Sequence, residues 1–142
     1  MSLVHIGNMG GQNYRAEVEL AAVNVTKDTV LYGASGYATN ASAAAIYTNT
    51  VIGVVQQSVD NSGGSAGDKS AIIEMSPLAL YEADCSGTMS AALRWTNVTL
   101  DTVATVDEDD AQTGKAGVIK LREMISASKA LVSINYASPT EA

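Results

Sequence analysis

Val51-Ile52-Gly53-Val54-Val55 and Lys115-Ala116-Gly117-Val118-Ile119 are two similar phrases in distant parts of this chain. Asp28-Thr29-Val30 precedes the first phrase, and Asp101-Thr102-Val103 precedes the second. Each phrase leads through a polar turn rich in Gly or Ser into a further β-branched run, Ala71–Glu74 or Leu131–Ile134. β-Branched runs joined by such turns are typical of hairpins. The repetition therefore predicts one hairpin used twice within a single domain, because two copies are too few for a solenoid.

The composition agrees with a small all-β body. The chain has 142 residues, of which 46% are hydrophobic, yet it contains no Phe and one Trp, so Val, Ile, Leu, Met and Tyr must build the core. Charged residues make up 16%, below the roughly 25% that is usual in soluble domains. We expect a single small β-sandwich or barrel-like domain whose weakly charged surface packs against other proteins.

The expected organisation is a flexible N-terminal arm over residues 1–15, a β domain over 16–136 and a frayed tail over 137–142. Glycines and a lack of periodicity define the arm, and Pro139 lies in the tail. Alternating or continuous apolar runs predict the strands. They cover residues 16–25, 29–32, 50–59, 69–75, 98–106, 116–125 and 130–136, with weaker segments at 78–82 and 87–93 and a loop over 38–45.

Charge and hydropathy restrict the partners. The net charge is −7 with only eight basic residues, so nucleic acid is an unsuitable partner, since binding phosphates needs clustered Lys and Arg. No run approaches the ~18 apolar residues of a membrane span, and the N-terminus lacks the pattern of a signal peptide. The lone Cys85 cannot form an intramolecular disulfide, which favours folding in a reducing compartment.

The segment Gly63 to Ser70 has the composition of a phosphate-binding loop but lacks its chemistry. That loop needs Gly directly before Lys and a helix after it, whereas here Asp68 precedes Lys69 and a β-branched run follows. A hairpin turn is the better interpretation.

The sequence contains few residues that could form a metal site or a catalytic site. The acidic run Asp107–Asp110 lacks the Gly and Glu positions of an EF-hand, so a solvated acidic turn is preferred to a Ca²⁺ or Mg²⁺ site. One His and one Cys cannot supply a zinc site. His5 lies in the expected arm, and Asp84 would make the thiol of Cys85 less reactive. Trp95 is interpreted as a core residue in preference to a sugar-binding platform. We therefore expect no enzyme activity, catalytic residue, metal or cofactor.

The order of these motifs over roughly residues 16–136 resembles the capsid decoration, or cement, proteins of tailed bacteriophages. The motifs are Gly33–Gly36, Thr50–Val55, Gly63–Gly67, Thr102-Val103, Lys115–Ile119 and Val132-Ser133-Ile134. The segment 38–45 and the stretch 76–97 depart from the pattern. The resemblance implies a β body that trimerises at local threefold positions on the outer surface of the capsid and stabilises the shell.

The same resemblance implies that the N-terminal arm reaches across the capsid. The expected partners are therefore the major capsid protein and two further copies of this chain, with no nucleic acid and no membrane. The protein would be made in the bacterial cytoplasm and end in the virion. The arm residues expected to contact the capsid are Leu3, Val4, His5, Ile6, Asn8, Met9 and Tyr14. A carbohydrate-binding or host-surface-binding module that uses Trp95 and some of the six Tyr is the alternative.

Overall fold

The computed structural model describes residues 3–9, 14–40, 50–102, 105–111 and 119–134. Strands dominate this part of the chain, and its helical content is one short 3-10 turn, η2 (Ala91–Leu93). The all-β prediction is confirmed. Within the same described residues, no helix combines the length and the hydropathy that a membrane span requires.

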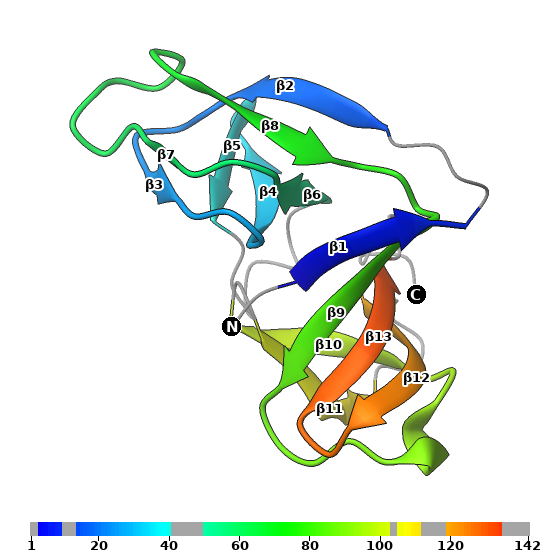
Figure 1. The fold of residues 1–142 in the computed structure, drawn as a ribbon. Helices are drawn as coiled ribbons and strands as arrows, with labels where there is room; N and C mark the ends of the chain where they lie inside the picture. The colour runs from blue at the N-terminus through cyan, green and yellow to red at the C-terminus, as the bar shows by residue number, and fades with distance from the viewer. Residues whose placement is uncertain (1–2, 10–13, 41–49, 103–104, 112–118, 135–142) are drawn as a thin grey trace.

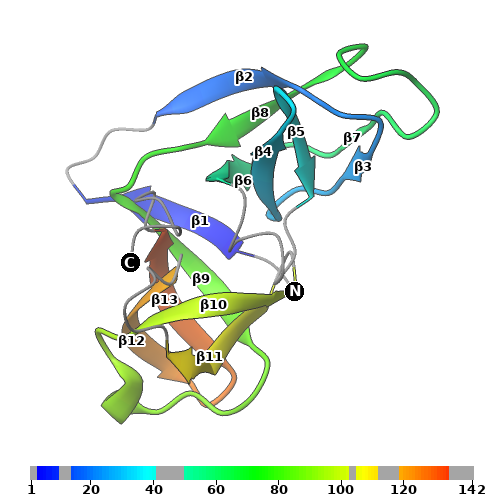
Figure 2. The same cartoon turned by 180° about the vertical axis from the view of Figure 1, so that it is seen from behind.

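The chain builds two lobes in succession (Figures 1 and 2). We call the sheet β2-β8-β6-β4-β5, with the small sheet β3-β7 beside it, the first lobe. Its strands are β2 (Arg15–Glu19), β3 (Asn24–Val25), β4 (Val30–Ala34), β5 (Tyr37–Asn40), β6 (Thr50–Val55), β7 (Val59–Asp60) and β8 (Ser70–Glu74).

The second lobe is the barrel formed by the last strands of the chain. They are β9 (Ala79–Cys85), β10 (Asn97–Thr102), β11 (Thr105–Ala111), β12 (Ile119–Ser126) and β13 (Lys129–Ile134). The parallel pair β9–β11 and the antiparallel pair β9–β13 close the barrel. The N-terminal strand β1 (Leu3–Asn8) pairs with β9 and lies between the two lobes in both views (Figures 1 and 2).

The two lobes share one strand topology. In the first lobe, antiparallel pairs run β2–β8–β6–β4–β5, and a parallel bridge from Leu20 to Ala38 joins the two ends. In the second lobe, antiparallel pairs run β9–β13–β12–β10–β11, and a parallel pairing of β11 with β9 joins the ends. The duplicated hairpin that the sequence predicts is therefore part of a larger duplication, in which β6 and β8 correspond to β12 and β13.

One predicted element of the repeat does not correspond between the lobes. Asp28-Thr29-Val30 leads into the start of β4, whereas Asp101-Thr102 closes the end of β10. The predicted strand over 98–106 is likewise a hairpin, since β10 and β11 pair across it. As a result, the acidic run Asp107–Asp110 lies within strand β11, and its interpretation as a turn is wrong. Asp107 pairs with Thr99 of β10, and the register then shifts before Ala111 pairs with Val98, an arrangement that composition alone does not reveal.

Strands β4 and β6 hold the lobes together because they are buried on both faces. Val30, Val51 and Val54 pack into a core with Leu3 and the second-lobe barrel. Leu31 and Val55 point the other way, into the core of the first lobe. A strand buried on both faces reads as a continuous apolar run, which explains why Val51–Val55 shows no alternation.

Gly53 marks the closest approach between β6 and β8. A Cβ at this position would lie 2.6 Å from the Glu74 carbonyl oxygen and 3.0 Å from Ile73 Cδ1. The register of β4 against β6 also shifts beside Gly53. A register shift and a close backbone approach therefore coincide at this glycine, and only a residue without a side chain fits.

Ion pairs on the surface of the second lobe link the paired strands β9 and β13. Lys129 Nζ lies 3.2 Å from Asp84 Oδ1 and 3.5 Å from Glu82 Oε1. The hydrogen bond to Asp84 and the attraction of its charge raise the pKa of Lys129 above the ordinary value of 10.5. Because the lysine is well exposed, solvent screens this pairing and it contributes modestly to stability.

Candidate functional site

The segment expected to be a flexible arm is instead part of the folded body. Residues 3–8 form β1, whose register with β9 runs from Leu3 opposite Ala83 to Asn8 opposite Ala79. Leu3 is fully buried, and its N–H donates to the Asp28 carbonyl at 2.9 Å. The prediction of an unpaired arm is wrong for residues 3–8, because an edge of the second lobe and an apolar slot between the lobes receive them. Residues 1–2 and 10–13 lie outside the described residues.

The structure separates the expected capsid-contact residues into inward and outward groups. Leu3 and His5 point toward the interior, where they pack between the lobes. Val4, Ile6 and Tyr14 are exposed. Met9 is half-buried and donates its N–H to the Leu78 carbonyl, and Asn8 ends β1. The outward residues remain available to a partner, whereas Leu3 serves the fold.

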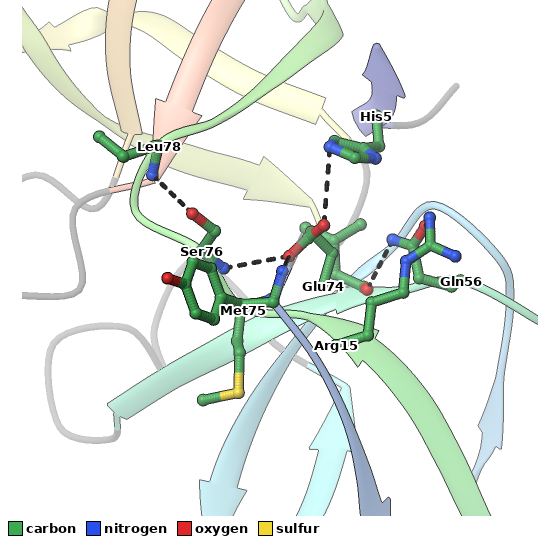
Figure 3. A network of polar contacts seen from close by, with 9 residues as sticks. His5, Arg15, Gln56, Glu74, Met75, Ser76 and Leu78 are labelled. Atoms are coloured by element: carbon green, nitrogen blue, oxygen red, sulfur yellow. Dashed lines mark hydrogen bonds and ion pairs between the residues drawn. The ribbon is translucent and has the colours of Figure 1, made fainter. Parts of the chain in front are cut away.

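Glu74 is the centre of the polar network at the lobe junction (Figure 3). Its carboxylate is fully buried at the end of β8. Oε2 accepts hydrogen bonds from the backbone N–H groups of Tyr14 at 2.9 Å, Met75 at 3.1 Å and Ser76 at 3.3 Å. Oε1 lies 3.7 Å from His5 Nε2 on β1. One carboxylate thus contacts the start of β2, the connection to β9 and the strand between the lobes.

The neighbours of Glu74 extend this network to both sides. Ser76 Oγ accepts from the Leu78 N–H at 3.1 Å, and Met75 N–H donates to the Tyr14 carbonyl at 2.8 Å. The His5 ring also packs against Tyr81, with centroids 5.6 Å apart. A buried carboxylate is tolerated only when donors surround it. The sequence signal is a Glu inside the apolar run Ile72–Met75, and the pattern alone does not indicate its role.

An apolar pocket opens beside this network. Tyr14, Met75, Ser76, Pro77 and Leu78 line a hollow of about 400 Å³. Tyr14 keeps 54% of its surface exposed, and Met75 and Leu78 are exposed as well. The connection between β8 and β9 presents Met75 and Leu78, and hydrogen bonds to Glu74 and Ser76 hold its backbone. We call Tyr14, Met75, Pro77 and Leu78 the junction surface. The geometry suits contact with another protein.

The 63–70 segment is a turn, as predicted. It connects β7 to β8, and a strand follows it where a phosphate-binding loop would have a helix. Lys69 Nζ donates to the Asp60 carbonyl within the turn at 2.7 Å. The lysine therefore serves the loop's own backbone in this structure.

Trp95 is on the surface, contrary to its interpretation as a core residue. Its exposed fraction is 62%, and its backbone has φ +71°. Its backbone N–H donates to the Leu121 carbonyl at 2.7 Å. This bond holds the turn after η2 against β12. A bulky residue at positive φ is an unusual conformation. The neighbouring Arg94 pairs with Glu123 at 3.4 Å.

The remaining candidate residues do not gather into a site. Cys85 is half-buried at the end of β9, away from His5 in the register of the sheet. In the ranges that the structure describes, no three side chains of the His, Cys, Asp and Glu types come together as metal ligands. The side chains of residues 108–110 lie outside the described set.

Comparison with known proteins finds a solved structure of similar fold. The chain is similar to the solved structure of the head fiber gp8.5 N base of bacteriophage phi29, with a TM-score of 0.53 and 15% sequence identity. The similarity covers 89% of this chain and 98% of that chain. No protein-family model matches the sequence, and no curated protein matches it. At this identity the match shows a shared fold, and it agrees with the resemblance to proteins of the phage capsid drawn from the sequence.

Proposed function

We propose that this chain is a structural protein of a bacteriophage virion. The observation that carries the proposal is the similarity in fold to a phage head fiber base, which extends over 89% of this chain and 98% of that one. A match of this extent includes both lobes. A single small barrel would be weaker support, because small β-barrels occur in many unrelated proteins.

The protein attaches to the outer surface of the assembled capsid by contact with the major capsid protein. The junction surface supports this attachment, since aromatic residues and Met are enriched in the cores of protein interfaces. Hydrogen bonds to Glu74 and Ser76 already hold the backbone that carries Met75 and Leu78, so this part of the contact surface is preformed. Because β1 is paired with β9, a partner also does not have to offset the ordering of residues 3–8, which would otherwise cost about 1–2 kcal/mol per residue.

The protein acts as a homotrimer at local threefold positions and stabilises the shell. Its low content of charged residues, 16%, and its exposed apolar side chains favour association into a closed symmetric oligomer. A trimer carries three copies of the junction surface, and linked contacts raise avidity by about 10²–10⁴. Binding to the assembled shell alone stabilises that shell by about 2.7 kcal/mol per site at a hundredfold excess over the Kd.

Sedimentation tests the attachment. Purified protein is mixed with expanded shells or with dissociated major capsid protein, and pelleting is compared between wild type and the double variant Met75→Asp/Leu78→Asp. The double variant Thr88→Asp/Ser90→Asp, at exposed positions of the second lobe, is the charge-matched control. Pelleting with shells, reduced at least tenfold in the first variant alone, supports the proposal. Equal pelleting of all proteins places the contact elsewhere, and no pelleting of wild type contradicts the attachment.

A carbohydrate-binding or host-surface-binding module is the second candidate, and the exposed Trp95 favours it. A tryptophan that is 62% exposed and held at positive φ is a suitable platform for a sugar ring. A glycan array with wild type and Trp95→Ala distinguishes this candidate. A glycan signal that disappears in the variant supports it, and the absence of any signal from wild type contradicts it.

A further inference from the structure

The turn between β7 and β8 buries an oxygen atom that its own fold leaves unsatisfied. Asn61 is 1% exposed, and its Nδ2 donates to the carbonyls of Ala21 at 3.0 Å and Ser65 at 3.1 Å. These bonds fix the orientation of the amide. Its Oδ1 is buried and accepts no hydrogen bond from any group in the described residues. A buried carbonyl oxygen without a donor is unfavourable, so the arrangement calls for a positively charged or donating ligand.

Asn61 Oδ1 faces a carboxylate across Gly64. A Cβ on Gly64 would lie 2.6 Å from Asn61 Oδ1 and 3.0 Å from Asp68 Oδ2, so the two oxygens flank the same point in space. A side chain at this position would therefore have to displace these oxygens. The surrounding hollow of about 400 Å³ is lined by Asp60, Asn61, Gly63, Gly64, Asp68 and Lys69.

Asp60 and Asp68 both line the hollow, and their carboxylates keep part of their coordinating capacity. Asp68 Oδ2 accepts the Ser65 N–H at 2.9 Å. Asp60 Oδ1 accepts the Ser62 hydroxyl at 2.5 Å and the Ser62 N–H at 2.9 Å. The Ser62 hydroxyl bond, followed by the backbone bond, lowers the pKa of Asp60. Each carboxylate has a second oxygen beyond these bonds, and each oxygen carries more than one lone pair.

We propose that this turn binds a calcium ion through Asn61 Oδ1 and the carboxylates of Asp60 and Asp68. Ca²⁺ accepts six to eight oxygen ligands in flexible geometry, including Asn side chains, main-chain carbonyls and waters. Mg²⁺ demands a tighter octahedron and retains its waters. Zn²⁺ prefers nitrogen and sulfur ligands, which the hollow lacks. With two carboxylates, the site belongs to the weak class of calcium sites, with a Kd of about 10⁻⁴–10⁻³ M.

Lys69 is the internal competitor for this site. Its ammonium lines the hollow and donates to the Asp60 carbonyl at 2.7 Å. A divalent ion at Asp60 is repelled by this charge, so removing the charge must strengthen calcium binding. The proposal therefore predicts opposite effects from neighbouring substitutions, an outcome that simple damage to the loop cannot produce.

Titration of the full chain with CaCl₂, followed by two-dimensional amide NMR, tests the site. Wild type should show saturable shifts confined to residues 60–69 and the contacting Leu20 and Ala21, with weaker response to MgCl₂ at the same concentration. Asp68→Asn should weaken binding by about tenfold, because it removes one of two ligand charges. Lys69→Met should tighten binding by several-fold. Glu123→Gln, which removes a distant carboxylate, should leave the Kd unchanged.

Thermal unfolding gives a second measurement. At about 10 mM CaCl₂ and a Kd near 1 mM, the Tm of wild type should rise by about 3–5 °C relative to EDTA, and Asp68→Asn should show less than half of this rise. Shifts that are unsaturable or spread over all acidic residues would indicate nonspecific binding only and would overturn the proposal. An unchanged Kd in Lys69→Met would equally overturn it. In either case water alone satisfies Asn61 Oδ1.

Discussion

Replacing Glu74 should weaken the junction between the two lobes by an amount that the structure allows us to calculate. In Glu74→Leu the carboxylate acceptor disappears from the N–H groups of Tyr14 and Ser76, while Met75 keeps its bond to the Tyr14 carbonyl. Hydrogen bonds to a charged group contribute about 1.5–3 kcal/mol each. The expected loss is therefore about 3–6 kcal/mol, a large fraction of the ~5–15 kcal/mol that stabilises a typical domain.

Glu74→Gln removes the negative charge of the side chain but keeps its shape. The amide oxygen still accepts from the backbone, but each bond falls to the ~0.5–1.5 kcal/mol of a neutral pair. The 3.7 Å contact with His5 Nε2 also loses the negative charge of the carboxylate. We expect a loss of about 2–3 kcal/mol, intermediate between wild type and Glu74→Leu. Glu17→Gln and Glu17→Leu, at an exposed carboxylate on β2, are matched controls and should change stability by less than about 0.5 kcal/mol.

Urea unfolding with linear extrapolation measures these differences, and amide hydrogen exchange locates them. The m-value should stay constant, and exchange at Ser76 should accelerate in Glu74→Leu more than exchange within β12 and β13. If Glu74→Leu is as stable as wild type, or more stable than Glu74→Gln, the buried carboxylate does not hold the junction and the reasoning fails.

Three further predictions concern the fold and the junction surface. Gly53→Ala should lower the free energy of unfolding in urea by about 1–3 kcal/mol, because its Cβ meets the backbone of β8 at 2.6 Å. Gly63→Ala, where a Cβ meets nothing within 4 Å, should be nearly neutral. Equal effects of the two substitutions would contradict the close packing at Gly53. Met75→Asp/Leu78→Asp should leave the Tm within a few degrees while weakening shell binding; loss of folding would show that these side chains serve the core. Lys129→Met should lower the Tm at pH 8, and this effect should diminish as the pH rises above 10.5. The pKa of Lys129 is raised in the folded protein, so its ion pairs contribute fully to stability below the unfolded-state pKa, and this contribution is lost as the lysine deprotonates. An effect of the substitution that persists at pH 12 would mean that the lysine stabilises the fold by packing.

The strands and turns encoded by local pattern could be predicted from the sequence. The β-branched runs that became β6, β8, β12 and β13 carry their own signal, and their pairing follows from the turns between them. The loop over 63–70 was assigned correctly because glycine spacing and the charge of Asp68 are local facts. The β class itself rests on the same short-range information.

The features that depend on long-range contacts could not be predicted. Strand β1 has too few residues and too many neighbouring glycines to show a period, and it becomes a strand because β9 pairs with it. The parallel pair β9–β11 joins segments whose sequences do not indicate each other as partners. Glu74 appears as an ordinary polar residue in the chain, and only the convergence of three backbone N–H groups reveals its role.

The predictions for Trp95 and for the acidic run were wrong for a related reason. Trp95 belongs by size to a core that lacks Phe, but a turn at positive φ presents it to solvent instead. Asp107–Asp110 has the composition of a loop, yet it continues strand β11, which pairs with β10 on either side of the run's last residues, at Asp107 and Ala111. In both cases tertiary pairing outweighs local propensity.

Electron cryo-microscopy of expanded phage shells incubated with the purified protein tests the central claim most directly. The account predicts added density on the outer surface at local threefold positions, with three two-lobed copies in each feature and the junction surface facing the major capsid protein. Density at another position, or from a single copy, would contradict the proposed trimer. Shells that carry no added density at saturating protein would contradict capsid attachment itself.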